Sequence, residues 1–136
     1  MLIFAIDDEP KILQFLHNAI AEAEPEAEIM DFSCGEALLS ALTEQHLTPD
    51  VVFADIRLRG ASGLDLAVKI KNISPETKII FVTGYSEYAA DAYRIHANGY
   101  IIKPADPERI REELLYLNLV QQKPEPQQKL RVKCFG

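Results

Sequence analysis

The sequence predicts an α/β domain in which a parallel sheet is covered by helices on both faces. Short apolar runs and amphipathic helical stretches alternate five times along the chain, with short connections between them. The run at residues 51–54, Val-Val-Phe-Ala, has no polar alternation, which is typical of a strand buried on both faces. Strands that alternate with helices in this way lie parallel and are joined by right-handed crossovers.

The predicted strands are short apolar runs, most of which end beside a polar or turn-forming residue. The second run is the weakest, because acidic residues interrupt it. The strands are expected at residues 2–6, 27–32, 51–54, 78–82 and 100–102.

The predicted helices are recognised by the residues at their starts. Pro10 and the pair Asp106-Pro107 suit a first helical turn, because proline has no N–H to satisfy there and aspartate caps the free amides. Ser33 to Glu36 has the pattern of a capping box, and Ser62 and Ser86 precede the next two helices. Five helices therefore follow the five strands.

Composition excludes several classes of protein. The 136 residues carry a net charge of −7, which argues against direct binding to nucleic acid and suits a site for a divalent cation. Cys34 and Cys134 have no metal-ligand spacing, and Cys34 is expected to be a small core residue. No run is long enough to span a membrane and no signal peptide is recognisable, so we expect a cytoplasmic protein.

A change of composition divides the chain near its end. Residues 1–121 are expected to form one domain, and the Gln-rich and Pro-rich stretch that follows is typical of a linker. Residues 130–136 begin a new alternating pattern. Residues 122–136 are therefore interpreted as a linker and the start of a truncated output domain.

Polar residues follow the predicted strands at points that should meet in space. Asp7 and Asp8 follow the first strand, Asp55 the third, Thr83 the fourth and Lys103 the fifth. The carboxyl ends of parallel strands lie on one edge of a sheet, so three carboxylates would crowd there, and Mg²⁺ would relieve their repulsion. A carboxylate nucleophile beside a metal, an ammonium and a hydroxyl is suited to phosphoryl transfer onto an aspartate.

These residues also carry a family resemblance over residues 1–121. The chain resembles the receiver domain of bacterial two-component response regulators, whose motifs occur here in the same order and at similar spacing. The matching stretches are Asp7-Asp8-Glu9, Asp55-Ile56-Arg57, Ser62-Gly63, Thr83-Gly84-Tyr85 and Tyr100-Ile101-Ile102-Lys103-Pro104. The resemblance implies a flavodoxin-like (βα)5 fold, doubly wound, with strand order 2-1-3-4-5.

The resemblance also implies a role for each site residue. Asp55 would accept a phosphoryl group from the phosphohistidine of a sensor histidine kinase. Asp8 and Asp55 would bind Mg²⁺ directly, Asp7 through water, and Arg57 through its backbone carbonyl. Lys103 would pair with the phosphoryl oxygens, and its peptide bond to proline is usually cis in the family.

A switch is implied as well. Thr83 would turn to the phosphoryl group, and Tyr100 would move inward into the space that is left. The face made by the fourth helix, fifth strand and fifth helix would then change its partner, with self-association through this face expected. The resemblance of residues 130–136 to a winged-helix activator domain implies transcriptional output, with DNA bound only by that downstream domain.

Two positions depart from the family pattern. Proline often stands four residues after the phosphorylated aspartate, and a hydrophobic residue two places further on. This chain has Arg59 and Ala61 there. Arg57 and Tyr85 occupy the positions that tune dephosphorylation in such domains, and because both are bulky we expect a phosphorylated form that is not especially short-lived.

The site residues and the function each have alternative interpretations. Taken singly, the acids could be helix caps or turn residues, and Thr83 and Lys103 ordinary strand-end residues. The main alternative function is an interaction domain of the same fold that works without phosphorylation. A phosphatase is disfavoured because Arg57 stands where a general acid would be needed, and flavin binding because no phosphate-cradling loop is present.

Overall fold

Five parallel strands form the centre of the molecule in the order β2-β1-β3-β6-β7. The computed structural model describes residues 1–120, so the predicted linker and output-domain start at 122–136 lie outside the described residues. Counted along the chain, these strands have the predicted order 2-1-3-4-5. They are β1 Leu2–Ile6, β2 Glu28–Phe32, β3 Val51–Ala54, β6 Lys78–Thr83 and β7 Gly99–Ile102.

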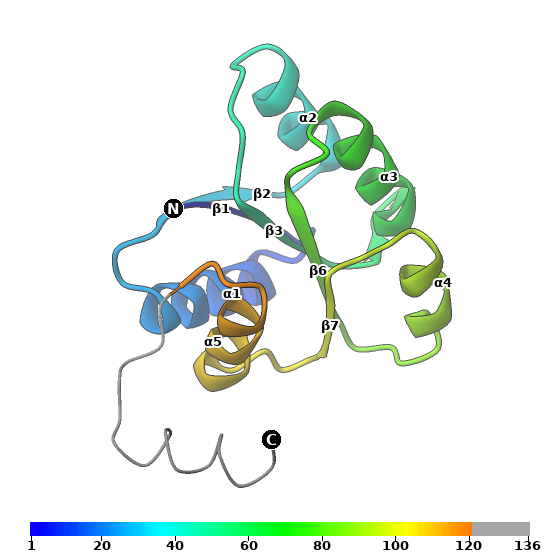
Figure 1. Cartoon of the computed structure of the whole chain (residues 1–136). Helices are drawn as coiled ribbons and strands as arrows, with labels where there is room; N and C mark the ends of the chain where they lie inside the picture. Colours follow the sequence, from blue (N-terminus) through cyan, green and yellow to red (C-terminus); the bar gives the residue numbers. More distant parts are fainter. Residues whose placement is uncertain (121–136) are drawn as a thin grey trace, which may run out of the picture.

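Helices cover both faces of this sheet (Figure 1). Helices α1 (Pro10–Ala23) and α5 (Pro107–Tyr116) lie side by side on one face. Helices α2 (Gly35–Thr43), α3 (Gly63–Ile73) and α4 (Ala89–Arg94) cover the other. Within residues 1–120, no helix is long and apolar enough to cross a membrane.

Each strand of the sheet centre contributes to two separate cores. In β1, Phe4 and Ile6 pack with side chains of α2 and α3, whereas Ile3 and Ala5 pack with side chains of α1 and α5. Successive side chains of a strand point to opposite faces, so a strand covered on both sides has no place for a polar residue. This explains the unbroken apolar runs of the sequence.

Three of the predicted helix starts are confirmed. Pro10 is the first residue of α1. The Ser62 hydroxyl accepts a hydrogen bond of 3.1 Å from the backbone N–H of Leu64 at the start of α3. The Asp106 carboxylate accepts one of 3.0 Å from the backbone N–H of Arg109 at the start of α5. These side chains satisfy amides that have no partner inside the helix.

The other two starts are wrong. Helix α2 begins one residue later than the capping-box pattern requires: Cys34 is its N-cap, and no side chain caps it. Helix α4 begins at Ala89, because the Ser86 carbonyl accepts the Ala89 N–H in a turn that precedes the helix. Cys34 is also exposed rather than in the core, since an N-cap residue lies outside the buried stripe of its helix.

A short hairpin follows β3 that the sequence did not predict. Strands β4 (Arg57–Leu58) and β5 (Ala61–Ser62) pair antiparallel, and Gly60 turns the chain with a φ of 71°. Glycine adopts this left-handed conformation without steric cost. Strands of two residues have no periodicity that a sequence could show, so no strand was predicted between residues 54 and 78.

Gly63 allows the start of α3 to pack closely against the backbone that follows the central strand β3. A Cβ atom at this position would lie 2.8 Å from Ile56 Cα and 2.9 Å from the carbonyl carbon of Asp55. Both neighbours are backbone atoms, which cannot move aside by a change of rotamer. Helix α3 can therefore pack here only if residue 63 is glycine.

We expect Gly63→Ala to lower the free energy of unfolding by about 3 kcal/mol or more, because the added methyl overpacks against rigid backbone. Urea unfolding followed by circular dichroism measures this change. Gly84→Ala is the matched control, since a Cβ at Gly84 would meet no atom within 4 Å. The control should differ from the parent by about 0.5 kcal/mol at most, and equal losses in the two variants would contradict the packing argument.

Candidate functional site

The polar residues predicted to meet do lie at one edge of the sheet. Asp7 follows β1 and Asp55 follows β3, strands that pair in parallel with Ile6 opposite Ala54. Thr83 is the last residue of β6, and Lys103 follows β7. All five strands run in the same direction, so these side chains share the edge formed by the carboxyl ends.

The Lys103 ammonium joins two carboxylates at this edge. Its Nζ lies 2.9 Å from Asp7 Oδ2 and 3.0 Å from Asp55 Oδ2. Asp7 is 1% exposed and Asp55 8% exposed. Two carboxylates so nearly excluded from water would be costly without a compensating charge, and the shared ammonium supplies it.

The pKa of Lys103 reflects this environment. Burial alone lowers the pKa of an ammonium, but the hydrogen bonds to Asp7 and Asp55 and the negative charge of both carboxylates outweigh it. The pKa of Lys103 is therefore raised above its ordinary value. The site thus favours the charged form of the lysine.

Backbone amides hold the second oxygen of each carboxylate. Asp7 Oδ1 accepts the Glu9 N–H at 3.0 Å, and Asp55 Oδ1 accepts the Arg57 N–H at 3.3 Å. Each bond spans two residues and closes a small turn directly after a strand. The local chain thus orients both carboxylates before any partner binds.

Asp8 is held by a contact that depends on Arg59. The Arg59 N–H donates to Asp8 Oδ2 at 2.7 Å, and the guanidinium Nε of the same residue lies 3.9 Å from that oxygen. Proline, which often stands at this position in the family that the chain resembles, has no N–H and could not make this bond. The departure from the pattern therefore has a structural consequence, which sequence reasoning missed.

A cleft of about 510 Å³ opens in front of these groups. Asp8 and Asp55 both line it, and Arg57 and Lys103 lie at the same cleft. Asp7 does not line it and faces Lys103 instead. The structure thus brings Asp8, Asp55 and Arg57 to a common space and places Asp7 behind the ammonium.

The donor set of the cleft suits a cation that keeps much of its water. Among residues 1–120 no group of three His, Cys, Asp or Glu side chains is arranged to enclose a metal. Asp8 and Asp55 nevertheless present two carboxylates to one cleft. Mg²⁺ binds through one or two carboxylates, water and phosphate oxygens rather than in an all-protein cage, so these residues fit it.

Thr83 and Tyr100 both contact the backbone of Tyr85. The buried Thr83 hydroxyl accepts the Tyr85 N–H at 3.4 Å, and the Tyr100 hydroxyl donates to the Tyr85 carbonyl. Burial raises the pKa of Tyr100, which keeps its hydroxyl protonated and able to donate. Tyr85 thus connects the two residues predicted to switch, a role that no pattern in the sequence indicated.

The Tyr85 ring lies under the Arg57 guanidinium. The guanidinium carbon is 4.6 Å from the ring centroid, within the range of a cation–π interaction. Both residues line the cleft beside Asp55. The pair therefore forms one wall of the site.

Comparison with known proteins identifies this arrangement. Residues 3–115 match the response regulator receiver domain family. The chain belongs to this family. The predicted resemblance and fold class are confirmed.

Relatives of this receiver domain include longer proteins. An uncharacterised response regulatory protein of Vibrio cholerae is 37% identical over 105 residues, which are 76% of this chain and 40% of that protein. The transcriptional regulatory protein BtsR of Escherichia coli is 32% identical over 143 residues, covering 98% of this chain and 58% of BtsR. The chain thus spans about half the length of these relatives.

A solved receiver structure matches the fold. The response regulator TrrA of Thermotoga maritima, crystallised in complex with Mg²⁺ and beryllium fluoride, is 31% identical and superimposes with a TM-score of 0.73. The match covers 85% of this chain and 97% of TrrA.

Replacement of Lys103 tests the charge balance at the sheet edge. We expect Lys103→Met to lower the free energy of unfolding at pH 8 by about 2 kcal/mol, less than a fully buried pair would lose because the lysine side chain is 21% exposed. A group whose pKa is raised by folding stabilises the protein fully below its unfolded pKa of about 10.4. That stabilisation disappears as the pH rises through the higher folded value.

The difference between the parent and Lys103→Met should therefore shrink above pH 10.4 or so. Urea unfolding at pH 8 and at stepped alkaline pH values measures it, with the exposed Lys69→Met as control. A difference that stays constant into strong alkali, or an equal loss in Lys69→Met, would contradict the assignment.

Proposed function

We propose that Asp55 is the phosphoacceptor of this receiver domain and that a sensor histidine kinase supplies the phosphoryl group. The observation that supports this proposal is the Asp55 carboxylate at the cleft wall, 3.0 Å from the Lys103 ammonium. A carboxylate that is held in one orientation beside a positive charge is well placed to act as a nucleophile.

In the proposed step, an Asp55 carboxylate oxygen attacks the phosphorus of a phosphohistidine. A P–O bond forms while the P–N bond breaks, and the electron pair of that bond leaves with the imidazole. Lys103 then pairs with the phosphoryl oxygens, whose charge replaces that of the free carboxylate. The Arg57 N–H, already directed at Asp55 Oδ1, holds the carboxylate in place during attack.

Mg²⁺ is the proposed cofactor, held by Asp8, Asp55 and the Arg57 carbonyl, with Asp7 acting through water. When bound, the ion neutralises charge on the transferring group and the carboxylates around it. The Arg59 N–H holds Oδ2 of Asp8, a residue that lines the cleft. The chain modifies itself in this step and is proposed as a switch rather than a turnover enzyme.

The switch is proposed to pass through Tyr85. The Thr83 hydroxyl accepts a hydrogen bond from the Tyr85 N–H, and this bond is lost when the hydroxyl turns to the phosphoryl group. The loop that carries Tyr85 is then free to move with Tyr100, whose hydroxyl is bonded to its carbonyl. Phosphorylation would thereby shift an existing equilibrium of the α4-β7-α5 face.

The whole protein is proposed to act in the cytoplasm as a transcription regulator. Support comes from BtsR, a transcriptional regulatory protein whose similarity covers 98% of this chain. Self-association through the α4-β7-α5 face would follow phosphorylation, and DNA would be bound only by a domain downstream of residue 121.

Phosphorylation with a small donor tests the acceptor. We expect the chain to gain one phosphoryl group on incubation with acetyl phosphate and Mg²⁺, and Asp55→Asn to gain none, because an amide is not a comparable nucleophile. Intact mass spectrometry in freshly mixed samples measures this.

The matched control is Asp65→Asn, an exposed aspartate in the first turn of α3, which should be modified like the parent. If the parent with Asp55 intact shows neither a gain of mass nor a response to beryllofluoride, the phosphorylation-independent interaction domain becomes the better explanation.

Thr83→Val tests the switch separately from acceptance. Valine keeps the shape of threonine but removes the hydroxyl, so the variant should still take up the phosphoryl group while its Tyr100 ring no longer responds. Ring resonances of Tyr100 with and without beryllofluoride and Mg²⁺ provide the measurement. Ser86→Ala, which removes a hydroxyl from an exposed loop position, is the control, and a Tyr100 response that persists in Thr83→Val rules out this route.

A further inference from the structure

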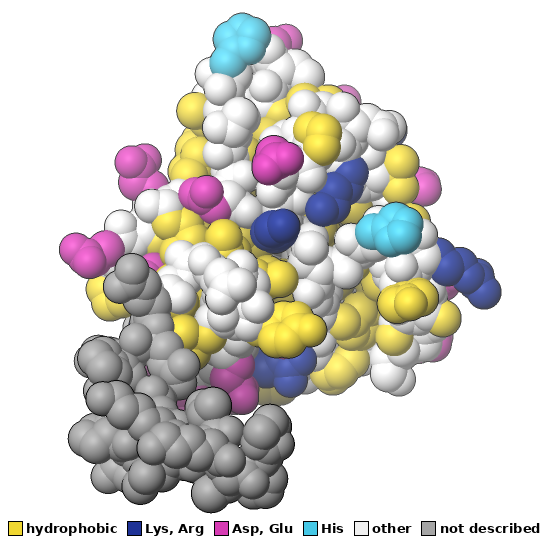
Figure 2. Space-filling model, in the orientation of Figure 1, with side chains coloured by type: hydrophobic (Ala, Val, Ile, Leu, Met, Phe, Trp, Pro, Cys, Tyr) yellow, Lys and Arg dark blue, Asp and Glu magenta, His cyan; other side chains and the backbone are white. Residues whose placement is uncertain are grey.

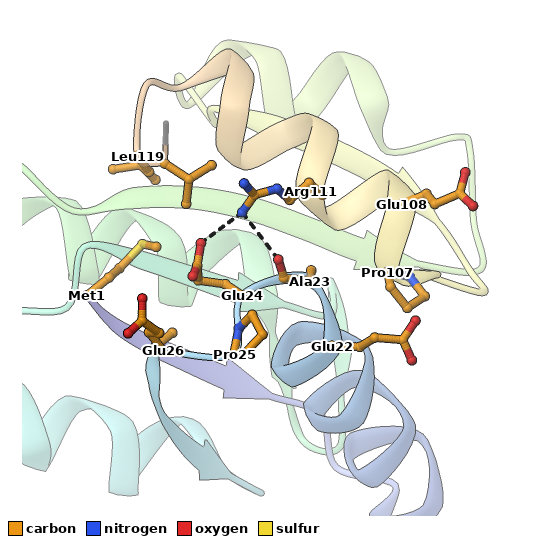
Figure 3. A pocket seen from close by; sticks show the side chains of 12 residues that line it. Met1, Glu22, Ala23, Glu24, Pro25, Glu26, Pro107, Glu108, Arg111 and Leu119 are labelled. Atoms are coloured by element: carbon orange, nitrogen blue, oxygen red, sulfur yellow. Dashed lines mark hydrogen bonds and ion pairs between the residues drawn. The ribbon is translucent and has the colours of Figure 1, made fainter. Parts of the chain in front are cut away.

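A second hollow lies away from the phosphoacceptor site, between the α1–β2 turn and α5 (Figure 3). This groove of about 740 Å³ is lined by residues 22–27, which are the last residues of α1 and the turn that follows, by Met1, and by residues of α5 and of the stretch after it. Met1 and the turn lie at the amino ends of β1 and β2, whereas Asp55 follows the carboxyl end of β3.

The floor of the groove is partly apolar and its rim is acidic. Pro25, Pro107 and Leu119 contribute apolar surface. Glu22, Glu26 and Glu108 also line it, and within residues 1–120 none of these three carboxylates forms an ion pair or a hydrogen bond. The space-filling view shows acidic side chains along the edge formed by the α1–β2 turn (Figure 2).

One carboxylate in the groove is already engaged. Arg111 Nη1 donates to Glu24 Oε2 at 2.9 Å and to the Ala23 carbonyl at 3.3 Å, which fastens α5 to the C-terminal end of α1. Figure 3 shows this pair among the residues that line the groove. The three other glutamates are left to a partner.

The chain itself supplies a segment of matching chemistry. Residues 129–133 read Lys-Leu-Arg-Val-Lys, in which three cations alternate with two apolar residues and no acid occurs. The whole chain has a charge of −7, so this basic stretch is opposite in sign to the rest. Alternation of this kind suits a surface with an apolar floor and an acidic rim.

The connection is short enough to deliver this segment. Val120, the last described residue, itself lines the groove. The nine residues from there to Lys129 reach about 30 Å at full extension. A tether of this length holds its end at an effective concentration on the order of millimolar, so even weak contacts populate the bound form.

We propose that residues 129–133 dock in the groove between the α1–β2 turn and α5. Lys129, Arg131 and Lys133 pair with Glu22, Glu26 and Glu108, and Leu130 and Val132 contact the apolar floor. The start of the segment beyond the receiver is thereby held against α5, one of the elements proposed to change on phosphorylation. The docking does not require phosphorylation of Asp55, so it stands or falls independently of the proposed function.

The test uses the full 136-residue chain with Cys34→Ser and a nitroxide on Cys134. In low salt, amide resonances of residues that line the groove should be broadened by the label. Glu22→Lys combined with Glu26→Lys and Glu108→Lys should reduce the docked fraction by about tenfold or more, since three exposed ion pairs become repulsive. The same spectra show whether each variant is folded.

Two further variants make the test specific. Reversal in the segment, with Lys129→Glu, Arg131→Glu and Lys133→Glu, should abolish the broadening, and combination with the groove reversal should restore it. Glu44→Lys with Glu76→Lys and Glu87→Lys, three exposed glutamates elsewhere, is the control for net charge and should keep the broadening.

Several results would overturn the proposal. The first is that the groove amides of the parent are not broadened, and the second is that broadening persists when the charges of either the groove or the segment are reversed. The proposal is also contradicted if the control variant loses the broadening, or if combining the two reversals does not restore it. Broadening seen only when labelled and isotope-enriched chains are mixed would assign the groove to the segment of a second copy instead.

Discussion

The charge balance among Asp7, Asp55 and Lys103 is the constraint on which the site depends. Two carboxylates at the ends of adjacent strands are almost excluded from water, and one ammonium serves both. That ammonium comes from β7, which is separated from β3 by β6. The site therefore exists only when four neighbouring strands are assembled in register, so folding itself brings the two carboxylates and the ammonium together.

The same geometry links the site to the surface of the molecule. Thr83 and Tyr100 reach the two sides of one peptide segment at Tyr85, and the Tyr85 ring is covered by the Arg57 guanidinium. Movement at the sheet edge can thus reach β7 and α4 through a few contacts without deforming the two cores.

Hydrophobic periodicity predicted the structure of this chain better than the residues at helix starts did. Long-period patterns succeeded: the strand runs, the helix stripes and the order of the polar strand-end residues all correspond to the structure. Local capping signals were divided. Ser62 and Asp106 cap their helices, but Ser33 and Ser86 do not, because the same residue types also fit the turns that precede a helix. The prediction that Cys34 lies in the core was wrong, because the burial of a residue at a helix start depends on which side of that start faces the sheet.

The chain order of apolar runs and polar ends was sufficient to predict a parallel sheet with Asp7, Asp8, Asp55, Thr83 and Lys103 on one edge. It was sufficient because periodicity is a local property of the sequence, and the alternation of strands with helices implies that the strands are parallel. Only the folded structure decided that Lys103 bridges Asp7 and Asp55 while Asp7 turns away from the cleft, that the Arg59 amide holds Asp8, and that Tyr85 joins Thr83 to Tyr100. Such contacts depend on distances between strands and loops far apart in the chain, and no local pattern encodes those distances.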